Sequence, residues 1–193
     1  KDRIISGYYN EGDKLKEIQI SKDLETSSTP VREALHKLSS EGFLEINPYK
    51  GVVVKTYKLQ DRKEAYMVYG KIHLQYLKWA RETNKGNQWE ELANLLQHLL
   101  IDEDDRHIFT KVQPFYMMLR SFVNSKILES CLINIQAVVN LDSAIKYAQD
   151  IETKLEDLYK EVLTGLRLTD YKMVEESFND IMILSIDSLH ISN

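Results

Sequence analysis

Thr29-Pro30-Val31-Arg32-Glu33-Ala34-Leu35 is the stretch of sequence that says most about the fold of this protein. Threonine is a good helix cap, and proline suits the first helical position because its φ is already helical and it has no N–H to lose. The valine, the leucine and, further on, Leu38 are spaced to share one apolar face of a helix. Gly42 is typical of the residue that ends a helix. The stretch therefore predicts a short amphipathic helix that begins at Thr29-Pro30.

The residues before this helix predict two shorter elements. Arg3-Ile4-Ile5 is typical of the end of a helix that stops at Gly7, and Gly12-Asp13-Lys14-Leu15 is typical of a turn that leads into a new element. Residues 17–24 predict a short helix with its three large aliphatic side chains facing inward: Ile18, Ile20 and Leu24.

The hydrophobic period changes after Gly42. An apolar segment at residues 43–46 and a β-branched one at residues 52–54 flank Asn47-Pro48-Tyr49-Lys50-Gly51, which has the composition of a turn. Two short strands around such a turn predict a β-hairpin. Helix, helix, turn, helix and hairpin in under sixty residues is the order of a winged helix-turn-helix domain.

From Leu59 onward the sequence predicts helices and no further strand. The expected helical segments are residues 59–83, 88–101, 105–123, 126–148, 151–167 and 169–189. We therefore expect a mainly α protein with two domains, a winged helix-turn-helix over residues 1–58 and an all-helical bundle over residues 59–193. The single cysteine, Cys131, lies in an apolar stretch and is expected to be a small core residue.

The net charge of −5 does not exclude DNA binding, because the charge is unevenly distributed. Residues 1–58 contain 10 Lys and Arg against 9 Asp and Glu, whereas residues 59–193 contain 15 against 21. The N-terminal part is therefore free to place positive charge on one face.

No apolar run is long enough to cross a membrane and no stretch has the pattern of a signal peptide, so we expect a cytoplasmic protein without a membrane partner.

The start of the predicted recognition helix offers groups that can contact DNA. In a helix-turn-helix the second helix lies in the major groove, with its N-terminal residues next to base edges and phosphates. Ser27, Ser28 and Thr29 provide hydroxyls there, and Arg32 can hold guanine or a phosphate with two hydrogen bonds. Lys50, at the tip of the predicted wing, can follow the DNA backbone. Each residue alone is more simply a helix cap or a solvated charge, but their order together favours DNA binding.

The sequence resembles the DNA-binding domain of the GntR family of bacterial regulators over about residues 4–56. The resemblance rests on these motifs: Gly12-Asp13-Lys14-Leu15, Thr29 to Leu35, Glu41-Gly42, Pro48, Gly51 and Val54. It implies a dimer on a palindromic operator, with DNA contacts from Ser27, Thr29, Arg32, Lys50 and Gly51. The family usually has arginine where this chain has Ser28, so one charge-assisted contact is missing and a different operator preference or affinity is expected.

The all-helical part resembles the FCD ligand-binding domain of the FadR branch of that family. Residues 114–119 with 124–128 match one of its motifs, and residues 158–170 match another. Many such domains bind a divalent metal through one aspartate and three histidines. The corresponding positions here are Val112, Tyr116, Tyr159 and Ile181. Two of them have no donor atom in the side chain and tyrosine is a poor ligand at neutral pH, so we expect no metal and no cofactor.

Two interpretations of these positions stay open. One is a pocket for a less polar effector, such as an acyl-coenzyme A or an organic acid, framed by these residues: Tyr66, Tyr69, His73, Val112, Tyr116, Tyr159 and Ile181. Tyrosine suits a ligand pocket because it combines a large apolar face with one hydrogen-bonding group. The other is a filled core, in a constitutive regulator whose helical domain serves only for dimerisation.

Enzymatic function is not expected. The sequence contains no G-x-G-x-x-G, P-loop, H-E-x-x-H or G-x-S-x-G motif, and the acidic run from Asp102 to Asp105 is more typical of a solvated turn than of a metal site. A winged helix that binds protein is the stronger alternative, because Ser28 replaces the family's arginine. The prediction is therefore a sequence-specific transcriptional regulator, a repressor, that binds double-stranded DNA as a homodimer.

Overall fold

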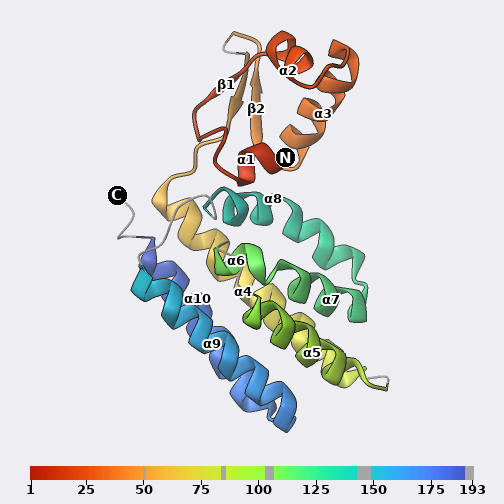
Figure 1. Ribbon diagram of the computed structural model, residues 1–193, viewed down its shortest axis with the longest axis vertical. Coiled ribbons are helices and arrows are strands. Elements are labelled where there is room, and N and C mark those ends of the chain that lie inside the picture. The colour runs from red at the N-terminus through yellow and green to blue at the C-terminus, as the bar shows by residue number, and fades with distance from the viewer. Residues whose placement is uncertain (50, 84–85, 103–106, 143–148, 190–193) are drawn as a thin grey trace.

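The computed structural model describes residues 1–49, 51–83, 86–102, 107–142 and 149–189. An N-terminal domain with a small three-stranded sheet lies at one end of a helical domain, next to helix α8 (Figure 1). The described chain is mainly helical, and its strands all belong to the N-terminal domain. The predicted fold class is therefore confirmed.

The N-terminal domain has the expected helix-turn-helix and wing. Its elements follow in chain order: α1 (Asp2–Ile5), β1 (Lys14–Leu15), α2 (Glu17–Asp23), α3 (Ser28–Ser40), β2 (Leu44–Asn47) and β3 (Gly51–Val54). The strands are antiparallel in the order β1-β3-β2, with β2 and β3 paired as a hairpin. Strand β1, where the sequence indicated only a turn, pairs its two residues with Val53 and Val52. Two residues are too few to show a strand period, so its pairing partner alone defines it.

Helix α3 buries one apolar face against the domain, as its sequence predicted. Val31 and Leu35 are buried and Leu38 is half-buried. The helix begins at Ser28 with Ser27 as its N-cap, and not at Pro30 with Thr29 as the cap. Gly42 follows the C-cap with a φ of +89°, a left-handed conformation that glycine adopts without steric cost.

The inward face predicted for α2 was wrong. Ile18 and Leu24 are 69% and 52% exposed, and Ile20 is half-buried. The buried residue of α2 is Ser21, whose hydroxyl donates to the backbone oxygen of Glu17 at 2.7 Å. A buried hydroxyl is tolerated when it is hydrogen-bonded, so the helix turns this small side chain inward and leaves two aliphatic ones in solvent.

The hydrophobic core of the N-terminal domain extends into the helical domain. It contains Phe43 and Leu44 together with Ala137 and Leu141, which come from α8 (Lys126–Asp142). Gly42 also lies against α8, because a Cβ at this position would be 3.3 Å from the Cβ of Ala137. The two domains therefore share one apolar cluster and are in direct contact.

Polar contacts support the same junction. The Tyr57 hydroxyl donates to the backbone oxygen of Gly42 at 2.8 Å. Arg62, in the first turn of α4 (Leu59–Glu82), forms an ion pair with Glu11 at 2.5 Å and donates from Nε to the backbone oxygen of Tyr57 at 3.1 Å. The segment that links the two domains is thus held by hydrogen bonds and an ion pair, because Tyr57 and Arg62 both contact residues of the N-terminal domain.

The helical domain is a bundle around α4. Its other elements are α5 (Gln88–Ile101), α6 (Ile108–Lys111), α7 (Gln113–Val123), α8, α9 (Gln149–Leu168) and α10 (Tyr171–Ser188). Helix α4 packs against α7, α8 and α10, while α9 packs against α5 and α10. The segment expected over residues 105–123 includes two helices that meet at Val112. Residues 143–148, expected as part of the helix at 126–148, and residues 103–105 of the acidic run lie outside the described residues.

Cys131 was expected in the core and is instead exposed. Its neighbour Leu132 on α8 is 1% exposed, whereas Ile133 is 47% exposed. Consecutive residues of an α-helix point about 100° apart, so an apolar run of three cannot all face one core. Among the residues that the structure describes, no helix is both long and apolar enough to cross a membrane.

Candidate DNA-binding surface and effector pocket

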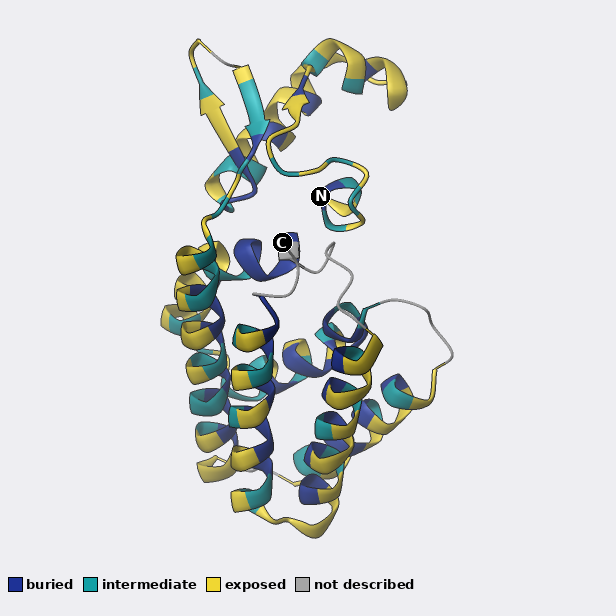
Figure 2. Cartoon of the chain, turned by 90° about the vertical axis from the view of Figure 1, so that its left-hand side faces the viewer, coloured by how far each residue is buried: buried dark blue, intermediate teal, exposed yellow. Residues whose placement is uncertain are grey.

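The predicted DNA-contacting residues that the structure describes lie at the outer end of the N-terminal domain. Figure 2 shows the wing and the α2–α3 turn at the end of the molecule farthest from the helical domain, both largely exposed. Ser27, Ser28 and Thr29 are exposed, and the side chain of Ser27 makes no cap bond to the helix. Three hydroxyls at the start of α3 are therefore open to a partner.

Arg32 lies one turn into α3 and is held by Glu17 of α2. Its Nε donates to Glu17 Oε2 at 3.1 Å, and its Nη2 donates to the same oxygen at 2.9 Å. The hydrogen bond from Arg32 lowers the pKa of the Glu17 carboxyl, so the pair is ionised at neutral pH. The Arg32 side chain is 62% exposed, and the guanidinium is therefore accessible from solvent while its position is constrained.

Of the two predicted wing residues, the structure describes Gly51. Gly51 is exposed with a φ of +80°, and a Cβ added there would meet nothing within 4 Å. Glycine is therefore required at position 51 by the backbone conformation and not by close packing. Lys50 lies outside the described residues. Tyr49, which the sequence did not predict as a contact, is 98% exposed, and its backbone N–H donates to Asn47 Oδ1 at 2.9 Å.

The seven residues of the predicted effector pocket are all buried in the helical domain. Five of them line one small cavity between α4, α6, α7 and α10: Tyr66, Tyr69, His73, Tyr116 and Ile181. Val112 and Tyr159 are also buried, but they do not line this cavity. The structure thus brings most of the predicted set together.

This cavity is too small for the expected effectors. Its volume is about 20 Å³, which is close to the space one water molecule needs. Pockets that bind drug-sized ligands measure roughly 300–1,000 Å³. The aromatic rings fill the space instead, with Tyr69 and His73 centred 4.3 Å apart and His73 and Tyr116 4.5 Å apart. In this conformation the site is a packed core.

The polar groups of this core are neutral at pH 7. Burial lowers the pKa of His73 to about 3, and the imidazole Nδ1 lies 2.9 Å from the backbone oxygen of Tyr69, to which it donates. Burial raises the pKa of Tyr69 to about 12 and raises those of Tyr116 and Tyr159 further. The hydroxyls of Tyr116 and Tyr159 are hydrogen-bonded to each other at 2.7 Å. No phenolate among these three tyrosines is therefore available as a metal ligand near neutral pH.

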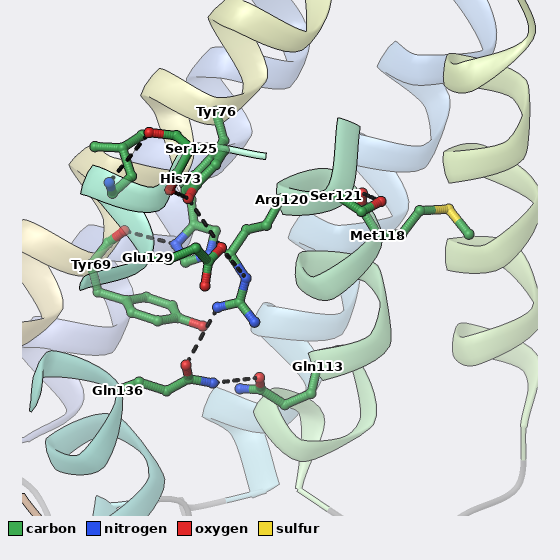
Figure 3. A network of polar contacts seen from close by, with 11 residues as sticks. Tyr69, His73, Tyr76, Gln113, Met118, Arg120, Ser121, Ser125, Glu129 and Gln136 are labelled. Atoms are coloured by element: carbon green, nitrogen blue, oxygen red, sulfur yellow. Dashed lines mark hydrogen bonds and ion pairs between the residues drawn. The ribbon is translucent and has the colours of Figure 1, made fainter. Parts of the chain in front are cut away.

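Beside this core is a polar network that the sequence did not predict (Figure 3). Arg120 of α7 lies 3.5 Å from the carboxylate of Glu129 on α8, which also accepts a hydrogen bond from the Tyr76 hydroxyl at 3.1 Å. Arg120 Nη1 donates to Gln136 Oε1 at 3.4 Å. The sequence signals for this network were two charged residues on largely apolar helices, Arg120 on α7 and Glu129 on α8. The network joins α4, α7 and α8, and α8 is the helix on which the N-terminal domain rests.

Comparison with known proteins identifies the N-terminal domain. A sequence model described as "Bacterial regulatory proteins, gntR family" matches residues 1–54. The "Uncharacterized HTH-type transcriptional regulator YdhC" of Bacillus subtilis (strain 168) is 24% identical over 157 residues, which is 78% of this chain and 69% of that protein. The "Nta operon transcriptional regulator" of Aminobacter aminovorans is 31% identical over 62 residues, which is 32% of this chain and 30% of that protein.

Solved structures share the fold over both domains. E. coli McbR/YncC superposes with a TM-score of 0.75 at 23% identity, covering 98% of this chain and 92% of that one. A putative GntR transcriptional regulator from Rhodococcus sp. RHA1 superposes with a TM-score of 0.77 at 19% identity, covering 100% of this chain and 94% of that one.

The winged helix-turn-helix and these relatives define the class: the protein is a transcriptional regulator with an N-terminal DNA-binding domain, and it is not an enzyme. Within that class, residues 1–54 match the GntR family of bacterial regulatory proteins.

Proposed function

We propose that this GntR regulator binds a palindromic operator in double-stranded DNA as a homodimer. Occupation of the operator represses transcription, and the protein works in the cytoplasm. The observation that carries the proposal is the exposure of Arg32 and three hydroxyls together at the start of α3. In a helix-turn-helix this end of the second helix meets the base edges. A palindrome presents two equal half-sites, so two copies of α3 are needed to read it.

A titration of the full chain with DNA tests this proposal. Duplexes are selected by the protein from a random pool, and binding of a selected duplex is followed by fluorescence anisotropy at several salt concentrations. We expect two chains per duplex and a logarithm of the binding constant that falls linearly with the logarithm of salt, by about 0.9 for each phosphate neutralised. If no duplex is enriched at low salt, DNA binding is refuted and a winged helix that binds protein, the alternative that Ser28 supports, takes its place.

We further propose that the helical domain is of the FCD type and works as a metal-free dimerisation body. The order of its helices supports the FCD type. The cavity of about 20 Å³ supports a filled core, because a pocket for an acyl-coenzyme A or an organic acid would have to be larger. Val112 and Ile181 have no donor atoms, and no group of three or more His, Cys, Asp or Glu in the described chain could hold a metal.

Elemental analysis and a ligand screen test the metal-free core. We expect protein purified without chelator to contain no stoichiometric zinc or nickel. Acyl-coenzyme A thioesters and organic acids should leave the midpoint of thermal unfolding unchanged, because a ligand that binds only the folded state would raise it. A stoichiometric metal refutes the first expectation, and a ligand that stabilises the protein shows that the core opens to form a receptor site.

A further inference from the structure

The contact between Glu17 and Arg32 links the two helices of the helix-turn-helix. Glu17 is the first residue of α2, and Arg32 lies in the second turn of α3. Besides the two bonds to Oε2, Arg32 Nε lies 3.3 Å from Glu17 Oε1, so both carboxylate oxygens face the guanidinium. The sequence gives no hint of this pair, because the two residues are 15 positions apart across a turn.

The geometry of the pair leaves the DNA-binding edge of Arg32 free. A guanidinium has five N–H donors in a planar fork. Glu17 occupies the N–H on Nε and one N–H on Nη2. Both N–H groups on Nη1 and the second one on Nη2 are left. One N–H of Nη1 and the remaining N–H of Nη2 point the same way and form the edge that can hold guanine O6 and N7, or two oxygens of a phosphate.

An ordered arginine binds with a smaller loss of conformational entropy. A free arginine side chain carries about 2 kcal/mol of rotamer entropy, much of which is lost when it is fixed against DNA. Glu17 restricts these rotamers before DNA arrives. Its negative charge also weakens attraction to phosphates in general, which lowers binding to DNA of any sequence.

We propose that Glu17 is a positioning residue that holds the Arg32 guanidinium with its Nη1–Nη2 edge toward the major groove, and thereby increases discrimination between operator and non-specific DNA. This inference rests on the proposed function of Arg32. Glu17 does not contact DNA itself, so its effect is on the ratio of specific to non-specific affinity.

The experiment measures that ratio for variants of the full chain. The probes are a duplex selected by the wild-type protein and a scrambled duplex of equal length, both at one salt concentration. Glu17→Gln removes the charge and most of the clamp, and Glu17→Asp keeps the charge but is one methylene too short. Glu33→Gln is the matched control, because Glu33 adjoins Arg32, is exposed and has no ion pair within the described part of the chain. Thermal unfolding of each variant confirms that it is folded.

Glu17→Gln should bind the selected duplex about three- to fivefold more weakly, the effect of one exposed, well-oriented ion pair, and the scrambled duplex at least as well as wild type. Glu17→Asp should lower the ratio similarly, which a pure charge effect would not do. Glu33→Gln should change both affinities together and leave the ratio unaltered. In an Arg32→Ala background Glu17→Gln should have no further effect on the ratio.

Two results separate the failure of this inference from the failure of the proposed function. If Arg32→Ala abolishes discrimination but both Glu17 variants keep the wild-type ratio, or Glu17→Gln raises it, the positioning role is refuted and Arg32 remains the DNA contact. If Arg32→Ala itself binds both duplexes like wild type, the proposed contact of Arg32 with DNA is refuted, and the role of Glu17 with it.

Discussion

Replacing Phe43 by alanine should lower the free energy of unfolding by about 3–5 kcal/mol, the range measured for buried aromatic side chains. Phe43 is 1% exposed and lies in the cluster that the N-terminal domain shares with α8. The truncation leaves a cavity beside Leu44, Ala137 and Leu141, and the cost is largest where the surrounding residues relax least. Loss of the Phe43 ring should therefore weaken the contact of the N-terminal domain with α8 as well as the core of that domain.

Urea unfolding followed by circular dichroism and by tryptophan fluorescence measures this effect. Trp79 and Trp89 both lie in the helical domain, so fluorescence reports that domain while circular dichroism reports the whole chain. Tyr49→Ala is the matched control, because Tyr49 is 98% exposed and should change stability by no more than about 0.5 kcal/mol. A loss below about 1 kcal/mol for Phe43→Ala would show that the shared cluster contributes little to stability.

Replacing Arg32 by alanine should weaken binding to a selected duplex by about 1–3 kcal/mol, which is roughly 5- to 150-fold. The variant loses a fork of donors that can make two bonds to one guanine. Arg32→Lys keeps the charge but has no fork, so we expect it to recover affinity for any DNA without recovering preference for the selected sequence.

The comparison is made by anisotropy at a fixed salt concentration, with Lys37→Ala as the control. Lys37 is an exposed cation in the last turn of α3, away from the end that reads bases. Its loss should reduce binding to selected and scrambled duplexes equally. If Arg32→Ala behaves in the same way as Lys37→Ala, Arg32 is a general phosphate contact and the specificity lies elsewhere on α3 or the wing.

The local elements of this protein could be predicted because each carries its own signal. Helix α5 spans Gln88–Ile101, the bounds that the sequence predicted around its leucine stripe. The hairpin follows from β-branched residues on one side of a proline and glycine turn, and Gly42 marks the end of α3. The residue types at the four positions that the FCD resemblance assigned to metal ligands are also a property of sequence, since the side chains of Val112 and Ile181 have no donor atom.

Contacts between distant residues could not be predicted in the same way. Strand β1 exists only because residues 14 and 15 meet β3 almost forty positions later. Ile18, Leu24 and Cys131 looked internal by type, yet the helices that carry them are covered on one face only, and periodicity does not say which partner covers it. Whether Tyr69, His73 and Tyr116 surround a ligand or fill a core depends on how closely their rings pack against one another, which the sequence does not state.

The sequence by itself determined the winged helix-turn-helix, the helical domain and the GntR motif from Thr29 to Leu35, because caps, glycines and hydrophobic periods act over a few residues. The tertiary structure alone decided how Arg32 is held by Glu17 and that the hydrophobic core of the N-terminal domain continues into α8. It also decided that the cavity at the expected pocket measures about 20 Å³. These properties depend on the distance between atoms of separate elements, and that distance is set only when the elements pack together.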